Sequence, residues 1–138
     1  SVQDSIAYLL ARLQKKKNLT YLFIAHDIAF IRTMCHKVVV MYKGAIVEEL
    51  DAFHLADAKH PYTKALINAI PKLDGKLPVG IKGNPPSFTN KQKGCLFAPR
   101  CEYASENCKY KEQKLTSIGN DRFIACTYME ERENMHHG

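Results

Sequence analysis

Hydrophobic positions in the first part of the chain follow regular periods. Apolar residues at 2, 6, 9, 10 and 13 recur at helical spacing, and the lysines at 15–17 suit the C-terminal end of that helix. Residues 21–25 (YLFIA) are continuously apolar, which predicts a strand buried on both faces of a sheet. A second helical pattern follows over 28–35, with Asp27 as its expected N-cap and Cys35 as a small core residue on its apolar face.

The middle of the chain predicts a hairpin and a further helix. The β-rich residues 37–42 and 45–49 flank Lys43-Gly44, a pair typical of a two-residue hairpin turn. A polar connection over 51–59 then leads to Pro61, which favours the first turn of a helix.

The composition changes at residue 72. Glycine and proline recur between 72 and 94, so this stretch is expected to be an irregular arm. We therefore predict an α/β fold in two parts. Residues 1–71 hold the buried strand, the helices and the hairpin, whereas residues 72–138 form a small, irregular, cysteine-rich extension.

The polar pair His26-Asp27 directly follows the apolar run at 21–25. Open α/β sheets place ligand-binding groups at the C-terminal ends of their strands, which makes His26 a candidate functional residue. The same pattern is equally typical of a buried strand that ends in an ordinary capping loop. The spacing alone leaves both interpretations open.

Composition narrows the class of protein. Of the 138 residues, 46% are hydrophobic and 25% charged, as in soluble globular proteins. No apolar run approaches the ~18 residues of a membrane span, and the first residues lack the pattern of a signal peptide. The formal net charge is +6, but the lysines are scattered, which favours a solvated surface over an anionic partner. The chain begins at Ser1 inside a helical pattern, so we expect a fragment of a longer protein.

Four of the five cysteines lie in the last third of the chain: Cys95, Cys101, Cys108 and Cys126. Cysteines without a secretion signal indicate reduced thiols and metal chemistry rather than disulfides. The spacing C-x5-C-x6-C-x17-C differs from that of zinc fingers and of common ferredoxins. Its wide gaps favour an iron–sulfur cluster over a single zinc ion. Unligated thiols in a small core are the third alternative.

Several segments share a sequence pattern with one family. These are YLFIAHD at 21–27, the hairpin at 40–49, HPYTKAL at 60–66, and GCxFxxRCxxA at 94–104 followed by Cys108 and Cys126. The chain resembles the C-terminal half of the ATPase subunits of bacterial and archaeal dipeptide and oligopeptide ABC transporters. The first segment is similar to the family's switch-histidine motif, and the last to the extension of its peptide-transporting members. Glu102 departs from the family, which frequently has proline there.

The resemblance implies that residues 1–71 are the C-terminal part of an ABC ATPase nucleotide-binding domain. The sequence contains no G-x-x-x-x-G-K-[ST] phosphate-binding loop. That loop, the signature motif and the catalytic glutamate of the parent subunit would lie upstream, so this chain alone should be inactive. In the parent, which binds ATP and magnesium, His26 would contact the γ-phosphate and the attacking water.

The resemblance also implies a cofactor and partners. The four cysteines would hold a [4Fe-4S] cluster, with zinc or oxidised cysteine pairs as the alternative in the isolated chain. The parent would pair with a second ATPase subunit and with membrane permease subunits, and would power peptide import from the cytoplasmic face of the plasma membrane. By itself the chain is expected to self-associate, because the strand at 21–25 would expose its edge.

A different class of function accounts for some of the same features. A small basic module that binds zinc through four cysteines, and that binds nucleic acid, would explain the net charge of +6. Against it, the cysteine segment has no obvious recognition helix, and its aromatic residues serve equally well as local core. We therefore expect no nucleic-acid partner.

Overall fold

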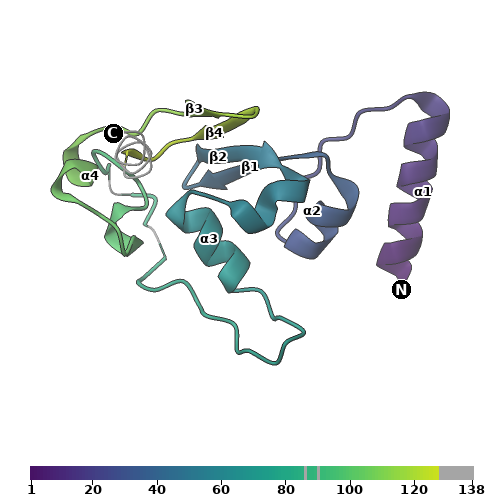
Figure 1. Ribbon diagram of the computed structural model, residues 1–138, viewed down its shortest axis with the longest axis horizontal. Helices are drawn as coiled ribbons and strands as arrows, with labels where there is room; N and C mark the ends of the chain where they lie inside the picture. Colours follow the sequence, from purple (N-terminus) through teal and green to yellow (C-terminus); the bar gives the residue numbers. More distant parts are fainter. Residues whose placement is uncertain (86, 90, 128–138) are drawn as a thin grey trace.

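A four-stranded antiparallel sheet, ordered β1-β2-β4-β3, lies at the centre of the fold (Figure 1). The computed structural model describes residues 1–85, 87–89 and 91–127. In chain order the elements are α1 (Val2–Lys17), α2 (Ile28–Met34), β1 (Lys37–Tyr42), β2 (Ala45–Asp51), the 3₁₀ helix η1 (Ala52–Asp57), α3 (Pro61–Asn68), the 3₁₀ helix η2 (Ala98–Arg100), α4 (Glu106–Tyr110), β3 (Thr116–Gly119) and β4 (Arg122–Ile124). None of the described helices is long and apolar enough to span a membrane.

The β1–β2 hairpin confirms the predicted turn. Lys43 and Gly44 both have positive φ angles, 51° and 81°, as a type I′ turn requires. Alternate residues of β1 face the core, and the pairing with β2 shifts between Val40 and Met41. This β-bulge explains why two successive residues of β2, Val47 and Glu48, are both buried.

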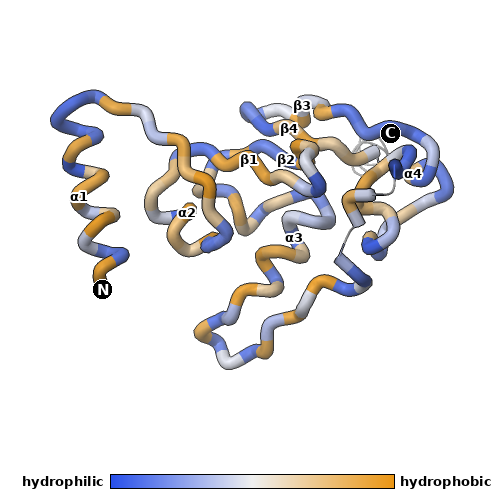
Figure 2. Tube along the Cα trace, turned by 180° about the vertical axis from the view of Figure 1, so that it is seen from behind, coloured by the Kyte–Doolittle hydropathy of each residue, from blue (hydrophilic) through white to orange (hydrophobic). Residues whose placement is uncertain are grey.

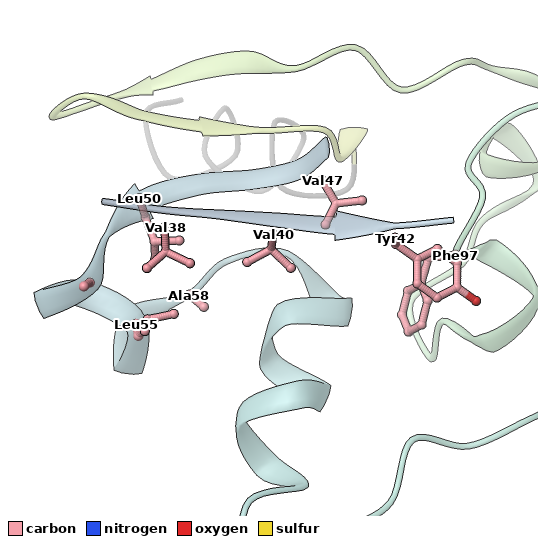
Figure 3. Packing of buried hydrophobic residues seen from close by; sticks show 9 residues of the cluster. Val38, Val40, Tyr42, Val47, Leu50, Leu55, Ala58 and Phe97 are labelled. Atoms are coloured by element: carbon pink, nitrogen blue, oxygen red, sulfur yellow. The ribbon is translucent and has the colours of Figure 1, made fainter. Parts of the chain in front are cut away.

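The core lies against one face of this hairpin (Figure 3). At one end, Leu55 of η1 packs near Val38 and Leu50, so the connection predicted to be only polar instead contributes a buried 3₁₀ helix. At the other end, Phe97 meets Tyr42 edge to face, with 5.2 Å between ring centroids. The core therefore uses residues from both predicted parts of the chain.

Sheet pairing also joins the two parts, because β4 hydrogen-bonds to β2. The arm predicted between them, residues 72–94, has no helix or strand among its described residues. The division at residue 72 itself stays a prediction, and residues 128–138 of its second part lie outside the described residues.

The prediction of a buried strand at 21–25 is wrong. The segment has no strand pairing, and the side chains of Leu22 and Ile24 are 90% and 97% exposed. Phe23, which lies between these two exposed residues in the sequence, packs its ring edge-on against Phe30 of α2. A strand buried on both faces needs neighbouring strands, and among the described residues none pairs with this segment.

Helix α1 confirms the predicted helical pattern, and the lysines at 15–17 lie in its last turn as expected. Ser1 and Asp4 form a capping box, and Asn18 ends the helix in the left-handed conformation. None of its residues is buried, and Figure 2 shows hydrophobic positions along a helix that stands away from the sheet. This exposed apolar surface is compatible with self-association, which stays a prediction.

A buried carboxylate joins the sheet to the start of α3. Glu48 is fully buried, and its carboxylate accepts hydrogen bonds from the backbone N–H groups of Lys59, at 2.7 Å, and His60, at 3.0 Å. Arg122 of β4 lies 3.6 Å from the same carboxylate and donates to the carbonyl of Asp57. A charge can be buried at this position because donors surround it.

We expect Glu48→Ala to destabilise the chain by about 3 kcal/mol, because it leaves two backbone donors and Arg122 without their acceptor. Urea unfolding followed by circular dichroism measures this loss. Glu49→Ala is the matched control, since Glu49 pairs with Lys37 at the surface and should matter much less. Equal losses in the two variants would contradict the role given to Glu48.

Candidate functional site

Cys95 and Cys108 are brought together by a close approach of two backbone segments. The Cys95 N–H donates to the Cys108 carbonyl at 2.7 Å. Gly94, just before Cys95, has a φ of +76°, and a Cβ there would overlap the backbone of Cys108 and Lys109. Only glycine fits this position without a shift of the surrounding backbone.

Cys101 joins this pair through tight turns. The Ala98 N–H donates to the Cys95 carbonyl, and the Cys101 N–H donates in turn to the Ala98 carbonyl. Phe97, between the two cysteines, is buried against Tyr42 and Tyr62, which fixes the loop to the core. Hydrogen bonds and the packing of Phe97 therefore hold Cys95 and Cys101 on one segment.

The three sulfurs are close enough to influence one another electrostatically. Burial raises the pKa of Cys95, the N–H groups of Phe97 and Ala98 lower it, and the Cys108 sulfur raises it. The pKa of Cys101 is raised mainly by burial and also by Cys95 and Cys108, and an N–H of Tyr103 lowers it. A bound cation would favour the thiolate forms, and N–H groups directed at sulfur are typical of iron–sulfur surroundings. Cys95, Cys101 and Cys108 therefore interact electrostatically, and backbone N–H groups approach the sulfurs of Cys95 and Cys101.

The fourth predicted ligand, Cys126, directly follows Ala125 at the end of β4. Ala125 lines a pocket of about 410 Å³ that Cys95 also lines. In the described part of the chain, no group of three or more histidine, cysteine, aspartate or glutamate side chains is arranged to hold a metal ion. The structure brings Cys95, Cys101 and Cys108 near one another, and the four-ligand site stays a prediction.

Cys35 lies apart from these residues in the sequence and ends α2. It packs against the main hydrophobic core, and burial raises the pKa of its thiol. This agrees with its predicted role as a small core residue.

His26 is exposed at a bend just before α2. The next residue, Asp27, caps that helix as predicted, since its carboxylate accepts from the N–H groups of Ala29 and Phe30. The structure does not bring His26 to the cysteine loop, which lies on the far side of the sheet from α1 (Figure 1).

Sequence reasoning missed the hairpin that carries Cys126. Asn120 and Asp121, in the turn between β3 and β4, both have positive φ angles, and they follow Gly119. Such a Gly-Asn-Asp sequence before the apolar pair Phe123 and Ile124 is a usable hairpin signal. The roles of Glu48 and Gly94 depend on contacts distant in sequence and had no such signal.

Comparison with known proteins points to one family. Residues 47–108 match the model of the oligopeptide/dipeptide transporter, C-terminal region. The chain is 40% identical over 134 residues to the oligopeptide transport ATP-binding protein OppF of Haemophilus influenzae, covering 91% of this chain. It is 37% identical over 131 residues to the dipeptide transport ATP-binding protein DppD of Escherichia coli, and 39% over 132 residues to DppD of Caldanaerobacter subterraneus, with 93% and 94% of this chain covered. Residues 47–108 are thus similar to the C-terminal region of oligopeptide/dipeptide transporters, and most of the chain is similar to the ATP-binding proteins of such transporters.

The match covers only part of those relatives. The chain spans 40% of the length of each of the three. The family region at 47–108 begins in β2 and ends at Cys108, so it includes Glu48, the start of α3 and three of the four predicted ligands. His26 and Cys126 lie outside that matched region, on either side of it.

We expect Gly94→Ala to destabilise the chain. Gly75→Ala is a matched control, because Gly75 has a φ of +75° and an added Cβ there would meet no other atom within 4 Å. Both variants strain the backbone, but only Gly94→Ala forces Cys95 away from Cys108, which should cost about 2 kcal/mol more. Urea unfolding of the two variants tests this, and equal losses would show that the close approach is unimportant.

Proposed function

We propose that this chain is the C-terminal portion of an ATP-hydrolysing subunit that powers peptide import by an ABC transporter. The observation that carries the proposal is the similarity of more than nine-tenths of the chain to peptide-transport ATP-binding proteins. The subunit would pair with a second ATPase subunit and with membrane permeases, at the cytoplasmic face of the plasma membrane. The comparisons favour this function over a nucleic-acid-binding module.

In this proposal His26 acts on ATP held mainly by upstream residues. A neutral imidazole donates one hydrogen bond and accepts another, which suits a group that orients the attacking water beside the γ-phosphate. The exposure of His26 leaves its ring accessible to a nucleotide bound against this surface. The residue would therefore contribute to turnover and little to ATP affinity.

In the complete subunit, we expect His26→Ala to lower ATP turnover by about 10²-fold or more while ATP still binds, because water orientation is lost and phosphate binding is kept. Steady-state hydrolysis and equilibrium ATP binding measure the two effects. His54→Ala removes another exposed histidine and should leave both unchanged. Normal turnover in His26→Ala would remove this residue from the mechanism.

The cysteines form the second part of the proposal. Cys95, Cys101, Cys108 and Cys126 would together hold one [4Fe-4S] cluster, or zinc when the cluster is absent. Three of these sulfurs are already near one another, and backbone N–H groups approach two of them. The group would stabilise a loop-rich segment, since metal binding by such a segment contributes folding energy.

We expect Cys101→Ser to lose most of the bound iron, because three thiolates leave the fourth metal position open. Anaerobic purification followed by iron and sulfide analysis measures the content. Cys35→Ser is the control and should keep it, since Cys35 belongs to the hydrophobic core. Full iron content in Cys101→Ser, or its loss in Cys35→Ser, would contradict the proposed ligand set.

A further inference from the structure

Residues 79–83 of the irregular arm are held at both ends, and we call them the strap. The arm leaves the end of α3 and returns to the loop that carries Cys95 and Cys101 (Figure 1). At the first end of the strap, the Val79 N–H donates to the carbonyl of Asn68, the last residue of α3, at 3.1 Å. The strap is therefore joined to the helix by backbone hydrogen bonding, although it has no secondary structure of its own.

The second end of the strap is held by the guanidinium of Arg100. Its Nε donates to the Lys82 carbonyl at 2.9 Å, and its Nη2 donates to the Ile81 carbonyl at 3.3 Å. A planar guanidinium that binds two successive carbonyls fixes the direction of the chain as well as its position. Gly83 then passes close to the same side chain, since a Cβ added there would lie 3.1 Å from Cγ of Arg100.

The guanidinium itself projects from a segment that the core holds. The Arg100 N–H donates to the Phe97 carbonyl at 2.9 Å, and Phe97 is buried against Tyr42 and Tyr62. Release of the guanidinium would thus free the strap and leave the cysteine loop packed in place. The strap is the part of this contact that can move.

An ion pair beside the guanidinium contributes much less. Lys82 Nζ lies 2.8 Å from Glu102 Oε1, but the two side chains are 75% and 60% exposed. Ion pairs between such exposed side chains add little stability, because water screens the charges and both side chains lose conformational freedom. The two hydrogen bonds from Arg100 are therefore the main contacts that hold this end of the strap.

The closed strap forms one wall of a small pocket. The pocket has a volume of about 160 Å³, and it is lined by Pro61 and Ala65 of α3, by Val79 and Lys82 of the strap, and by Phe97. When the strap moves away, the apolar surface of α3 and Phe97 beneath it becomes accessible.

We propose that residues 79–83 are a releasable strap, which the guanidinium of Arg100 holds closed over the pocket between α3 and Phe97. Its opening is a local transition of a few residues, distinct from unfolding of the sheet. The strap does not depend on the proposed function, because neither a nucleotide nor a cysteine thiol takes part in the contacts that hold it.

Trypsin reports directly on the open strap. To cut after Lys82, the protease must bind the Lys82 side chain in its specificity pocket and the Lys82 carbonyl in its oxyanion hole. In the closed strap that carbonyl accepts from Arg100. Cleavage after Lys82 therefore requires opening, and its rate follows the open population when opening and closing are fast.

The experiment measures initial rates of tryptic cleavage in the full chain, kept reduced, by mass spectrometry of the peptides. We expect Arg100→Met to raise the rate after Lys82 about tenfold, because methionine keeps an apolar side chain but donates no hydrogen bond. Glu102→Gln is the matched control, which removes the ion pair and should stay within about twofold of the wild type. Cleavage after Lys76, before the strap, should be the same in all three proteins.

Hydrogen exchange tests whether the strap opens as a unit. Val79 contacts α3 at the opposite end of the strap from Arg100, and its amide is protected by the bond to Asn68. We expect Arg100→Met to speed exchange of the Val79 amide severalfold, since release of one end loosens the other. Glu102→Gln should leave it unchanged.

Four results would overturn the proposal. One is a wild-type rate after Lys82 in Arg100→Met, and another is an equal rise in Glu102→Gln. The third is a parallel rise in cleavage after Arg122, whose side chain is held to the Asp57 carbonyl, because that would mean that the whole fold opens. The fourth is unchanged exchange at Val79, which would show that only the Arg100 contact is lost and that no strap is released.

Discussion

The burial of the Glu48 carboxylate constrains most of the structure. A carboxylate without donors is costly inside a protein, so donors must surround this position. The chain supplies them from the loop before α3 and from Arg122 on β4. Strand β2, the start of α3 and the last hairpin must therefore assemble together, although up to 74 residues separate Glu48 from Arg122.

The cysteine loop depends on the same assembly. Phe97 holds the loop by packing between the aromatic rings of Tyr42 and Tyr62, which belong to β1 and α3. The N–H of Ala125 holds the last hairpin by its hydrogen bond to the Val47 carbonyl. The extension thus packs against the β1–β2 hairpin and α3, so it is not connected to them by the irregular arm alone. A metal group bound there would lie in a loop that contacts α3 directly through Phe97 and Tyr62.

Local rules of sequence predicted the elements whose causes are local. The turn at Lys43-Gly44, the cap at Asp27 and the proline at the start of α3 all formed as expected. Each depends on the conformations and hydrogen bonds of a few neighbouring residues. The cysteine spacing predicted a four-ligand site. Cys95, Cys101 and Cys108 lie near enough to influence one another's pKa values, and the four-ligand site stays a prediction.

The sequence by itself determined the turn at Lys43-Gly44 and the starts of α2 and α3, because these follow from residue type and short spacing. Only the tertiary structure decided where apolar runs are buried. Residues 21–25 have a strand's composition, yet Leu22 and Ile24 are exposed because no described strand lies beside them. Tertiary structure alone also decided that Glu48 is buried and that Cys95 meets Cys108, since both depend on partners brought together from distant parts of the chain.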